Sequence, residues 1–302
     1  MSFKINLMLS RLKTYFGNSI KHVKRLQEGF TNHVYEFSVK NKKFIYKEYS
    51  SDNDNERNAL IRIKTPEIIL NDSSYRIEEY LEHLDLDVSE HMPEIVEAIK
   101  SMHSLDTNGM ESFDSFVERL YGEAVTHLKY NSDTKIVEIL EGLKKKAKIL
   151  IDNNKYKPGL SHNDLHANNM LLTKNGVVII DYELCTTGDI LFDIANFFCK
   201  THLDNEKSKN GMSGGYTKKD EKRFLKLYFS DSKVDQMDIL NRVKIFKGIS
   251  HFIWFMWAVP KLTHKFNSNF NCDNYASDRL YNLRELEFVS QIEETELRSL
   301  LL

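Results

Sequence analysis

The chain has 302 residues, of which 41% are hydrophobic and 28% charged, with a net charge of −2. This is the composition of an ordinary soluble globular protein, and the balanced charge argues against a nucleic-acid surface or a polybasic membrane anchor. No apolar run is long enough to span a bilayer. The three cysteines have no metal-ligand spacing, and basic residues interrupt the apolar N-terminus. Both features predict a cytoplasmic protein without a secretory leader.

The first 80 residues predict an antiparallel sheet with one inserted helix. Residues 2–16 have helical spacing of apolar side chains, and Gly17 and Asn18 stop that helix. We expect it to pack on the sheet, although its basic residues also allow a place on a membrane surface. A second helix is expected at 52–64. Alternating apolar residues predict five strands, at 22–28, 34–39, 43–49, 67–70 and 75–81.

From residue 89 onward the pattern is helical, with one interruption. Helices are expected at 89–105, 112–129, 133–152, 190–202, 217–230, 235–264 and 272–298. The interruption is a β-hairpin, in which Met170–Leu172 and Val177–Ile180 flank a turn that ends at Gly176. The order predicts an α+β, bilobal protein. A small antiparallel-sheet lobe at 1–84 would bind a nucleotide, and a larger, mainly helical lobe at 85–302 would bind substrate and carry the catalytic groups.

Four polar side chains surround the predicted hairpin: His162, Asp164, Asn169 and Asp181. Phosphoryl transfer depends mostly on positioning and charge neutralisation. One carboxylate must orient a hydroxyl and accept its proton late, and Asp164 has the right place for this role. An amide and a second carboxylate must hold Mg²⁺ on the phosphates of ATP, and Asn169 and Asp181 suit it. His162 would brace the loop. The alternative is that these residues only cap turns.

The first lobe offers groups for the phosphates. Lys47 lies in an apolar strand and Glu56 on the following helix, an arrangement typical of a lysine that neutralises nucleotide phosphates. A strand lysine by itself is usually a solvated edge residue. In the turn before the second strand, Thr31 and Asn32 could also donate hydrogen bonds to phosphate.

An aromatic stripe lies in the second lobe. Trp254 and Trp257, the two tryptophans of the chain, are three residues apart and share one face of a helix. Such a stripe can be core packing, or it can form a cage for an ammonium group held by cation–π attraction. The pattern leaves both readings open.

Together these segments resemble the choline/ethanolamine kinases, within the aminoglycoside phosphotransferase-like and protein-kinase-like group. The resemblance to the wider group lies in His162-Asn-Asp164, Asn169 and Ile180-Asp181, and it runs from about residue 25 to about residue 285. The narrower family is indicated by Ile180-Asp-Tyr-Glu183, Phe192-Asp193-Ile-Ala-Asn196-Phe-Phe-Cys199, Ser250-His251-Phe-Ile-Trp254-Phe-Met-Trp257, Tyr275-Ala276-x-x-Arg279, Gly29-Phe-Thr31-Asn32 and Ile77-Glu-Glu79-Tyr80.

The resemblance implies a protein-kinase-like fold and an ATP-dependent kinase that phosphorylates the hydroxyl of a small cationic alcohol, choline or ethanolamine. It implies that Asp164 is the base and that Asn169 and Asp181 are the ligands of Mg²⁺. Lys47 and Glu56 become the phosphate-side pair. The adenine would lie against Glu79, Tyr80 and Leu81, and the ammonium pocket would comprise Glu183, Trp254, Trp257 and Tyr275.

Three positions differ from the family pattern. Lys200 stands where choline kinases have a glutamate near the ammonium, and Leu184 and Cys272 each stand where a tyrosine is usual. A lysine in the pocket would repel a cationic substrate, and Asp204 could restore the negative charge. Other acceptors therefore stay open, namely an aminoglycoside, thiamine or a sugar, as does a non-catalytic protein that only binds nucleotide or ligand. The sequence predicts no nucleic-acid partner and no membrane insertion, and it allows a homodimer.

Overall fold

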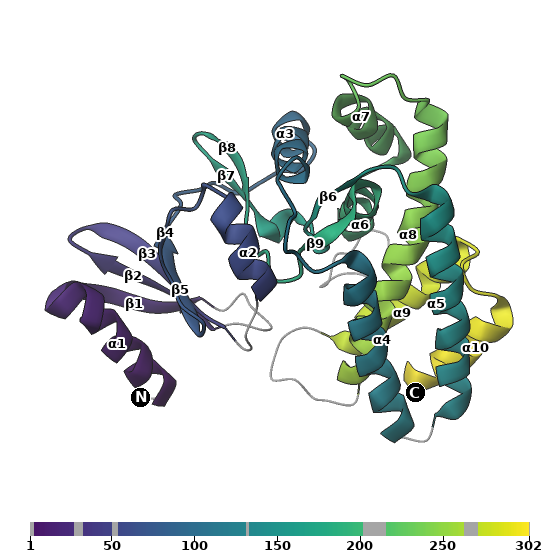
Figure 1. The fold of residues 1–302 in the computed structure, drawn as a ribbon, viewed down its shortest axis with the longest axis horizontal. Helices are drawn as coiled ribbons and strands as arrows, with labels where there is room; N and C mark the ends of the chain where they lie inside the picture. Colours follow the sequence, from purple (N-terminus) through teal and green to yellow (C-terminus); the bar gives the residue numbers. More distant parts are fainter. Residues whose placement is uncertain are drawn as a thin grey trace. The chain divides into compact units, whose positions relative to one another are not determined.

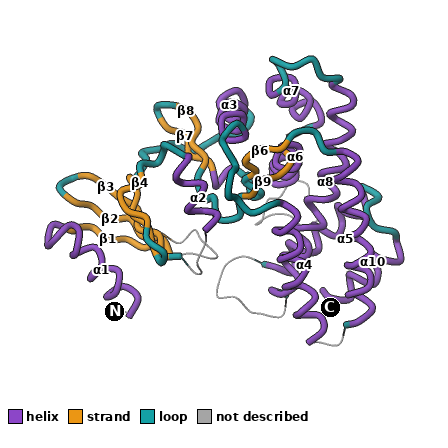
Figure 2. The backbone as a smooth tube through the Cα atoms, in the orientation of Figure 1, coloured by secondary structure: helices purple, strands orange, loops and turns teal. Residues whose placement is uncertain are grey.

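The chain divides into two structural units, residues 1–84 and residues 85–302 (Figure 1). The computed structural model describes residues 3–26, 33–49, 54–130, 133–201, 216–262 and 271–301. The first unit contains an antiparallel sheet and the second is mainly helical (Figure 2). This confirms the predicted α+β class.

The sheet of the first unit has five strands in the order β1-β2-β3-β5-β4, and each neighbouring pair is antiparallel. Helix α2 (Asp54–Arg62) is inserted between β3 and β4. All five predicted strands are present, with ends shifted by two residues at most. The strands are β1 (Ile20–Leu26), β2 (His33–Val39), β3 (Lys42–Glu48), β4 (Ile68–Asn71) and β5 (Tyr75–Glu79).

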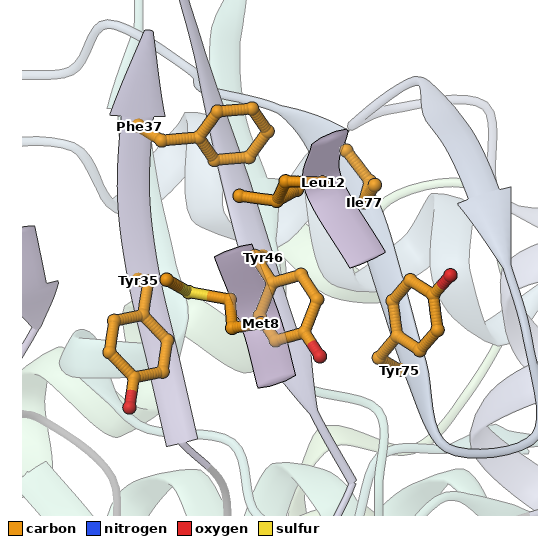
Figure 3. Close-up of a cluster of buried hydrophobic side chains, with 7 residues drawn as sticks. All are labelled: Met8, Leu12, Tyr35, Phe37, Tyr46, Tyr75 and Ile77. Carbon is orange, nitrogen blue, oxygen red and sulfur yellow. The ribbon is translucent and has the colours of Figure 1, made fainter. Parts of the chain in front are cut away.

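Helix α1 (Phe3–Phe16) packs its apolar face on this sheet. Met8 and Leu12 are 2% and 0% exposed. They lie among aromatic and aliphatic side chains of β2, β3 and β5 (Figure 3). The helix ends at Gly17, whose φ of +59° is a conformation that glycine adopts without steric cost. The predicted packing role of this helix is therefore confirmed, because the apolar face is used within the protein.

The second unit is built around helix α8 (Gln236–Ala258), which packs against α4, α5, α6, α7 and α9. Its residues from Gly248 to Met256 are all buried, so this part of the helix is enclosed on every side, as expected of a central helix. The helices around it are α3 (Met92–His103), α4 (Phe113–Tyr130), α5 (Thr134–Asn154), α6 (Ile190–Thr201), α7 (Lys218–Tyr228), α9 (Cys272–Glu285) and α10 (Gln291–Arg298).

The predicted hairpin is confirmed, and a second pair of short strands accompanies it (Figure 2). The hairpin joins β7 (Met170–Thr173) to β8 (Gly176–Ile179). The second pair, β6 (Pro158–Ser161) and β9 (Thr186–Asp189), was not predicted from the sequence. Gly188 sits so close to β6 that a Cβ there would lie 2.9 Å from the Ser161 hydroxyl oxygen. Proline and glycine in these strands resemble turn signals, which explains the omission.

The predicted helix at 272–298 is wrong as a single element. It is broken between α9 and α10, where Glu287 has a φ of +57°. Ser290 then begins α10 with a capping box that it forms with Glu293. The helix predicted at 235–264 also ends early, at Ala258, and a 3₁₀ turn follows (Val259–Lys261).

Several predicted features lie outside the described residues, namely Thr31, Asn32, Asp204 and the polar loop at 204–215. Among the residues that the structure describes, no helix combines the length and apolar character needed to cross a bilayer. All three cysteines are buried.

Replacing Leu12 with alanine should lower the free energy of unfolding by about 2–4 kcal/mol, because it leaves a cavity between α1 and the sheet. Leu7→Ala is the matched control, since Leu7 lies on the same helix and is 37% exposed. Urea unfolding followed by circular dichroism measures both. Equal, small effects of the two substitutions would show that α1 contributes little to the core of the first unit.

Candidate active site

The first unit contains a buried cluster of charges around Glu56. The Lys47 ammonium on β3 lies 2.9 Å from Glu56 Oε1 on α2. Arg76, which faces Lys47 across the β3–β5 pairing, also bonds to Glu56 and donates from Nε to Glu78 Oε2 at 2.6 Å. Lys47, Glu56 and Arg76 are all at most 4% exposed. The strand lysine and the helix glutamate thus form the expected ion pair, and Lys47 is not a solvated edge residue.

The charges in this cluster keep Glu56 ionised. Burial alone would raise the pKa of Glu56, but Arg76 and Lys47 lower it to about 2. The shared carboxylate in turn fixes the position of the Lys47 ammonium. Sequence reasoning missed Arg76. Its signal would have been a positive charge on the strand that pairs with β3, at the position opposite Lys47.

The segment predicted to lie against adenine follows β5. Glu79 ends the strand, and its Oε1 accepts from the backbone N–H of Glu67 at 3.0 Å. Tyr80 donates its backbone N–H to the Lys43 carbonyl at 3.3 Å, and the Lys43 ammonium lies 4.7 Å from the centre of its ring. The Leu81 carbonyl lies 2.8 Å from His83 Nδ1. These contacts hold the segment in an extended form, and contact with adenine stays a prediction.

In the second unit, the loop after β6 is held by the buried carboxylate of Asp193 on α6. Asp193 accepts from the backbone N–H groups of His162 and Asn163, at 2.6 and 2.7 Å. Its Oδ2 also lies 3.1 Å from Nε2 of the buried His103. Asp193 is fully buried, so its charge is balanced by these donors and not by water. The carboxylate fixes the backbone immediately before Asp164.

One amide side chain and one hydroxyl extend this support. Asn196 on α6 donates to the Asn163 carbonyl at 2.9 Å, and Ser250 on α8 donates to Asn196 Oδ1 at 2.8 Å. Asn163 has a φ of +65°, a left-handed conformation that asparagine tolerates better than most residues. The motifs around Asp193 and Ser250 thus position the loop. Both residues lie in recognisable sequence motifs, but the sequence alone does not indicate this supporting role.

His162 joins the loop to the end of the hairpin. Its Nε2 donates to the Ile180 carbonyl at 2.9 Å, and its Nδ1 accepts the backbone N–H of Asp164 at 3.3 Å. One donor and one acceptor are the pattern of a neutral imidazole, and neither nitrogen is left for acid–base chemistry. The bracing role predicted for His162 agrees with this geometry.

Asn169 and Asp181 lie at adjoining points of the hairpin. The Ile180 N–H donates to the Asn169 carbonyl at 3.0 Å, which brings the residue before Asp181 onto Asn169. Asn169 Nδ2 donates to the Asp164 carbonyl at 2.9 Å, so its amide oxygen is the atom oriented to accept or to coordinate. Asp181 has a φ of +66° and is half-buried. Within the described residues no three His, Cys, Asp or Glu side chains gather around a point. One amide and one carboxylate fit Mg²⁺, which takes other ligands from phosphate and water.

The carboxylate of Asp164 is paired with Lys200 from the end of α6. The Lys200 ammonium lies 2.8 Å from Asp164 Oδ1, and His166 Nε2 lies 3.6 Å from Oδ2. Burial alone would raise the pKa of Asp164, but Lys200 and His166 hold it well below its ordinary range. Asp164 is therefore ionised and positioned to accept a hydrogen bond.

Trp254, Trp257 and Tyr275 form one aromatic cluster, contributed by α8 and α9. The two indoles are 5.5 Å apart and Trp257 is 5.8 Å from Tyr275, each pair edge to face. The buried Arg279 donates to the Tyr275 hydroxyl at 2.9 Å and orients its ring. Trp254 is 3% exposed, yet its Nε1 has no hydrogen-bond partner among the residues that the structure describes.

Lys200 connects this aromatic cluster to Asp164. Its ammonium lies 3.9 Å from the Trp254 ring centre and 5.6 Å from that of Tyr275. Asp164, Lys200, Trp254 and Tyr275 thus form one cluster, which we call the acceptor pocket in the proposal below. Glu183 and Leu184 follow the hairpin and are half-buried. The Leu184 carbonyl accepts from Asn163 Nδ2 at 2.7 Å, which gives that position a backbone role.

Asp193→Asn should lower the free energy of unfolding by about 3 kcal/mol or more, because an amide cannot accept from both backbone N–H groups and His103 while remaining fully satisfied. Asp231→Asn is the control. Asp231 pairs with Lys100 at 2.8 Å, but its side chain is 82% exposed, so the stability should hardly change. Thermal unfolding of the two variants decides the matter. Similar stability of both would contradict the anchoring role of Asp193.

Comparison with known proteins gives consistent matches. The family model described as choline/ethanolamine kinase matches residues 73–283. The chain is 31% identical over 143 residues to probable choline kinase 2 of Arabidopsis thaliana, but this match spans only 40% of that protein and 44% of this chain. Probable choline kinase 1 of the same plant is 24% identical over 300 residues, 83% of this chain and 84% of that protein.

Two solved structures share the fold. An ethanolamine kinase of Plasmodium vivax superposes with a TM-score of 0.75 and 19% identity, over 96% of this chain and 89% of that one. LicA in complex with AMP gives a TM-score of 0.68 and 18% identity, over 95% of this chain and 100% of that one. At these identities the structures support the fold, and not the substrate, of this chain.

Proposed function

Because the chain belongs to the choline/ethanolamine kinase family, we propose that it transfers the γ-phosphoryl group of ATP to the hydroxyl of choline or of a related amino alcohol such as ethanolamine. A cytoplasmic location, a homodimer and the lack of a nucleic-acid partner stay predictions from the sequence.

The choice of a cationic alcohol as the acceptor rests on one observation. A single ammonium group, that of Lys200, contacts both the Asp164 carboxylate and the Trp254 ring, at 2.8 and 3.9 Å. The base and an aromatic surface suited to cations are therefore close enough to serve one small molecule. An alcohol whose ammonium is two carbons from its hydroxyl spans that separation, with the ammonium on the indole and the hydroxyl at Asp164.

The groups around the hairpin and Glu56 support the nucleotide part of the proposal. Asn169 and Asp181 would hold Mg²⁺, which would neutralise charge on the phosphates of ATP. Lys47, fixed by Glu56 at 2.9 Å, would contact the phosphates, and the segment from Glu79 to Leu81 would lie against adenine. The AMP bound to LicA supports use of an adenine nucleotide by this fold.

Asp164 would orient the acceptor hydroxyl and accept its proton late in the transfer. Phosphoryl transfer has a loose transition state, so this residue contributes mainly by alignment of the nucleophile. Its low pKa suits that task, since the carboxylate must be ionised when the alcohol binds. The loop geometry set by Asp193 holds the backbone of Asp164 in place for it.

The alternatives are less well supported. An aminoglycoside is a polycation and needs acidic side chains, whereas the charged groups that lie over the rings of the aromatic cluster include the cations of Lys200, Lys261 and Arg279. A binding protein without activity would have no need of Asp164, Asn169 and Asp181 together.

A coupled assay for ADP release tests the proposal directly. Choline or ethanolamine should stimulate ADP release well above the rate without acceptor, and Asp164→Asn should reduce kcat at least about 1,000-fold while the Kd for ATP changes less than about threefold. Absence of stimulation by any cationic alcohol would refute the activity. Substantial turnover by Asp164→Asn would refute the role of that residue.

Truncation of Trp254 distinguishes a substrate cage from core packing. Trp254→Ala should raise the KM for the alcohol about tenfold or more, because it removes the cation–π surface, and it should leave the KM for ATP nearly unchanged. Trp254→Phe should restore part of the affinity, since it keeps an aromatic face. Initial rates at varied alcohol and varied ATP separate the two constants. An equal rise of both would indicate a loss of packing only.

A further inference from the structure

The Lys200 side chain fills the position that the proposed function gives to the substrate's ammonium. Its side chain is 13% exposed, and its ammonium is 2.8 Å from Asp164, 3.9 Å from the Trp254 ring centre and 5.6 Å from the Tyr275 ring centre. These three partners come from the loop after β6, from α8 and from α9. Contacts from three separate elements define the place of the ammonium, so it is not a loosely held surface charge.

These contacts occupy the Trp254 ring and the Asp164 carboxylate at the same time. While the Lys200 ammonium lies on Trp254, a second ammonium on that ring would face a like charge at contact distance. While it lies against Asp164 Oδ1, that oxygen is engaged by a cation rather than by an acceptor hydroxyl. The pocket thus contains a cation of the chain's own, tethered to α6.

We propose that Lys200 is the specificity-determining residue of the acceptor pocket: its ammonium is an intramolecular competitor that a cationic alcohol must displace from Trp254 and Asp164 in order to bind. This inference rests on the proposed function, because it assigns the aromatic cluster to the acceptor's ammonium.

A cationic alcohol that displaces Lys200 can replace both contacts that the Lys200 ammonium makes in the pocket. The incoming ammonium replaces that of Lys200 on the indole, and the incoming hydroxyl donates a hydrogen bond to Asp164 in place of the ion pair with Lys200. A cation without a hydroxyl restores only the first contact, and an uncharged alcohol restores only the second. Because the tethered ammonium acts at a high effective concentration, only molecules that restore both contacts compete well with it. Lys200 therefore selects for cationic alcohols and weakens their apparent affinity.

Lys200→Met keeps the length of the side chain and removes its charge. It should lower the KM for choline and ethanolamine about tenfold, which is about 1.4 kcal/mol, and it should leave the KM for ATP within about twofold. Lys200→Arg, which keeps the charge, should leave the KM for the alcohols high. Lys200→Ala is a second neutral variant, in case methionine fills the pocket.

Lys144→Met is the matched control. Lys144 makes the same two kinds of contact far from the loop, with its ammonium 4.1 Å from the Tyr121 ring centre and 2.7 Å from Glu118. Its substitution should leave the KM for each alcohol unchanged. An equal effect of Lys144→Met and Lys200→Met would show a general effect of charge and overturn the proposal.

Tryptophan fluorescence tests the competition without any turnover. The chain's two tryptophans are Trp254 and Trp257, so the tryptophan fluorescence of the protein comes from the aromatic cluster itself. Tetramethylammonium chloride should alter the emission of Lys200→Met at about one tenth of the concentration needed for the unsubstituted protein. If no alcohol is phosphorylated by either protein but this difference is found, the proposed function fails and the role of Lys200 as a resident cation stands.

Two results would overturn the role of Lys200. The first is that Lys200→Met and the unsubstituted protein respond to the same concentrations of tetramethylammonium. This would mean that the Lys200 ammonium does not compete for the aromatic cluster. The second is a higher KM for the acceptor in both Lys200→Met and Lys200→Ala, which would mean that Lys200 binds the acceptor instead.

Discussion

The second unit depends on one buried carboxylate. Asp193 accepts from two consecutive backbone N–H groups, those of His162 and Asn163, and its position on α6 links the loop to the helical core. A charge at 0% exposure is costly unless donors surround it, and here two backbone groups and His103 provide them. This interaction holds the loop rigid at the point where Asp164 must be placed. The hairpin and His162 then add Asn169 and Asp181 at defined positions.

Each unit contains ion pairs that are shielded from solvent. Glu56 balances Lys47 and Arg76 in the first unit, and Lys200 balances Asp164 in the second. The two cases differ in what surrounds them. Arg76 is closed in by Glu56 and Glu78, whereas Lys200 also lies on an indole whose N–H has no partner among the described residues. In the first arrangement Glu56 holds two cations in place, whereas in the second we propose that the cation is replaceable.

Much of this architecture can be read from the sequence because the signals are local. The periodicity of α1, the turn signal of the hairpin and the polar residues at its ends each depend on neighbours along the chain. The i, i+3 spacing of Trp254 and Trp257 likewise predicts one shared face, and the rings are 5.5 Å apart.

What could not be predicted depends on partners far apart in sequence. Nothing near Asp193 shows that its carboxylate accepts from residues 30 and 31 positions earlier. In the pairing of β6 with β9, Gly159 lies opposite Gly188, and both glycines resemble turn signals in the sequence. Lys200 was expected to repel a cationic substrate, but only the structure shows its ammonium on Trp254 and against Asp164. Arg76 was missed for the same reason, since its partner Glu56 lies on another element.

A crystal structure of the protein with choline and a non-hydrolysable ATP analogue tests the central claim most directly. We expect the trimethylammonium group on the faces of Trp254 and Tyr275 and the choline hydroxyl against Asp164. The Lys200 ammonium should have moved away from its present position, 3.9 Å from the Trp254 ring centre. Choline bound elsewhere while Lys200 keeps its contacts with Trp254 and Asp164 would contradict it.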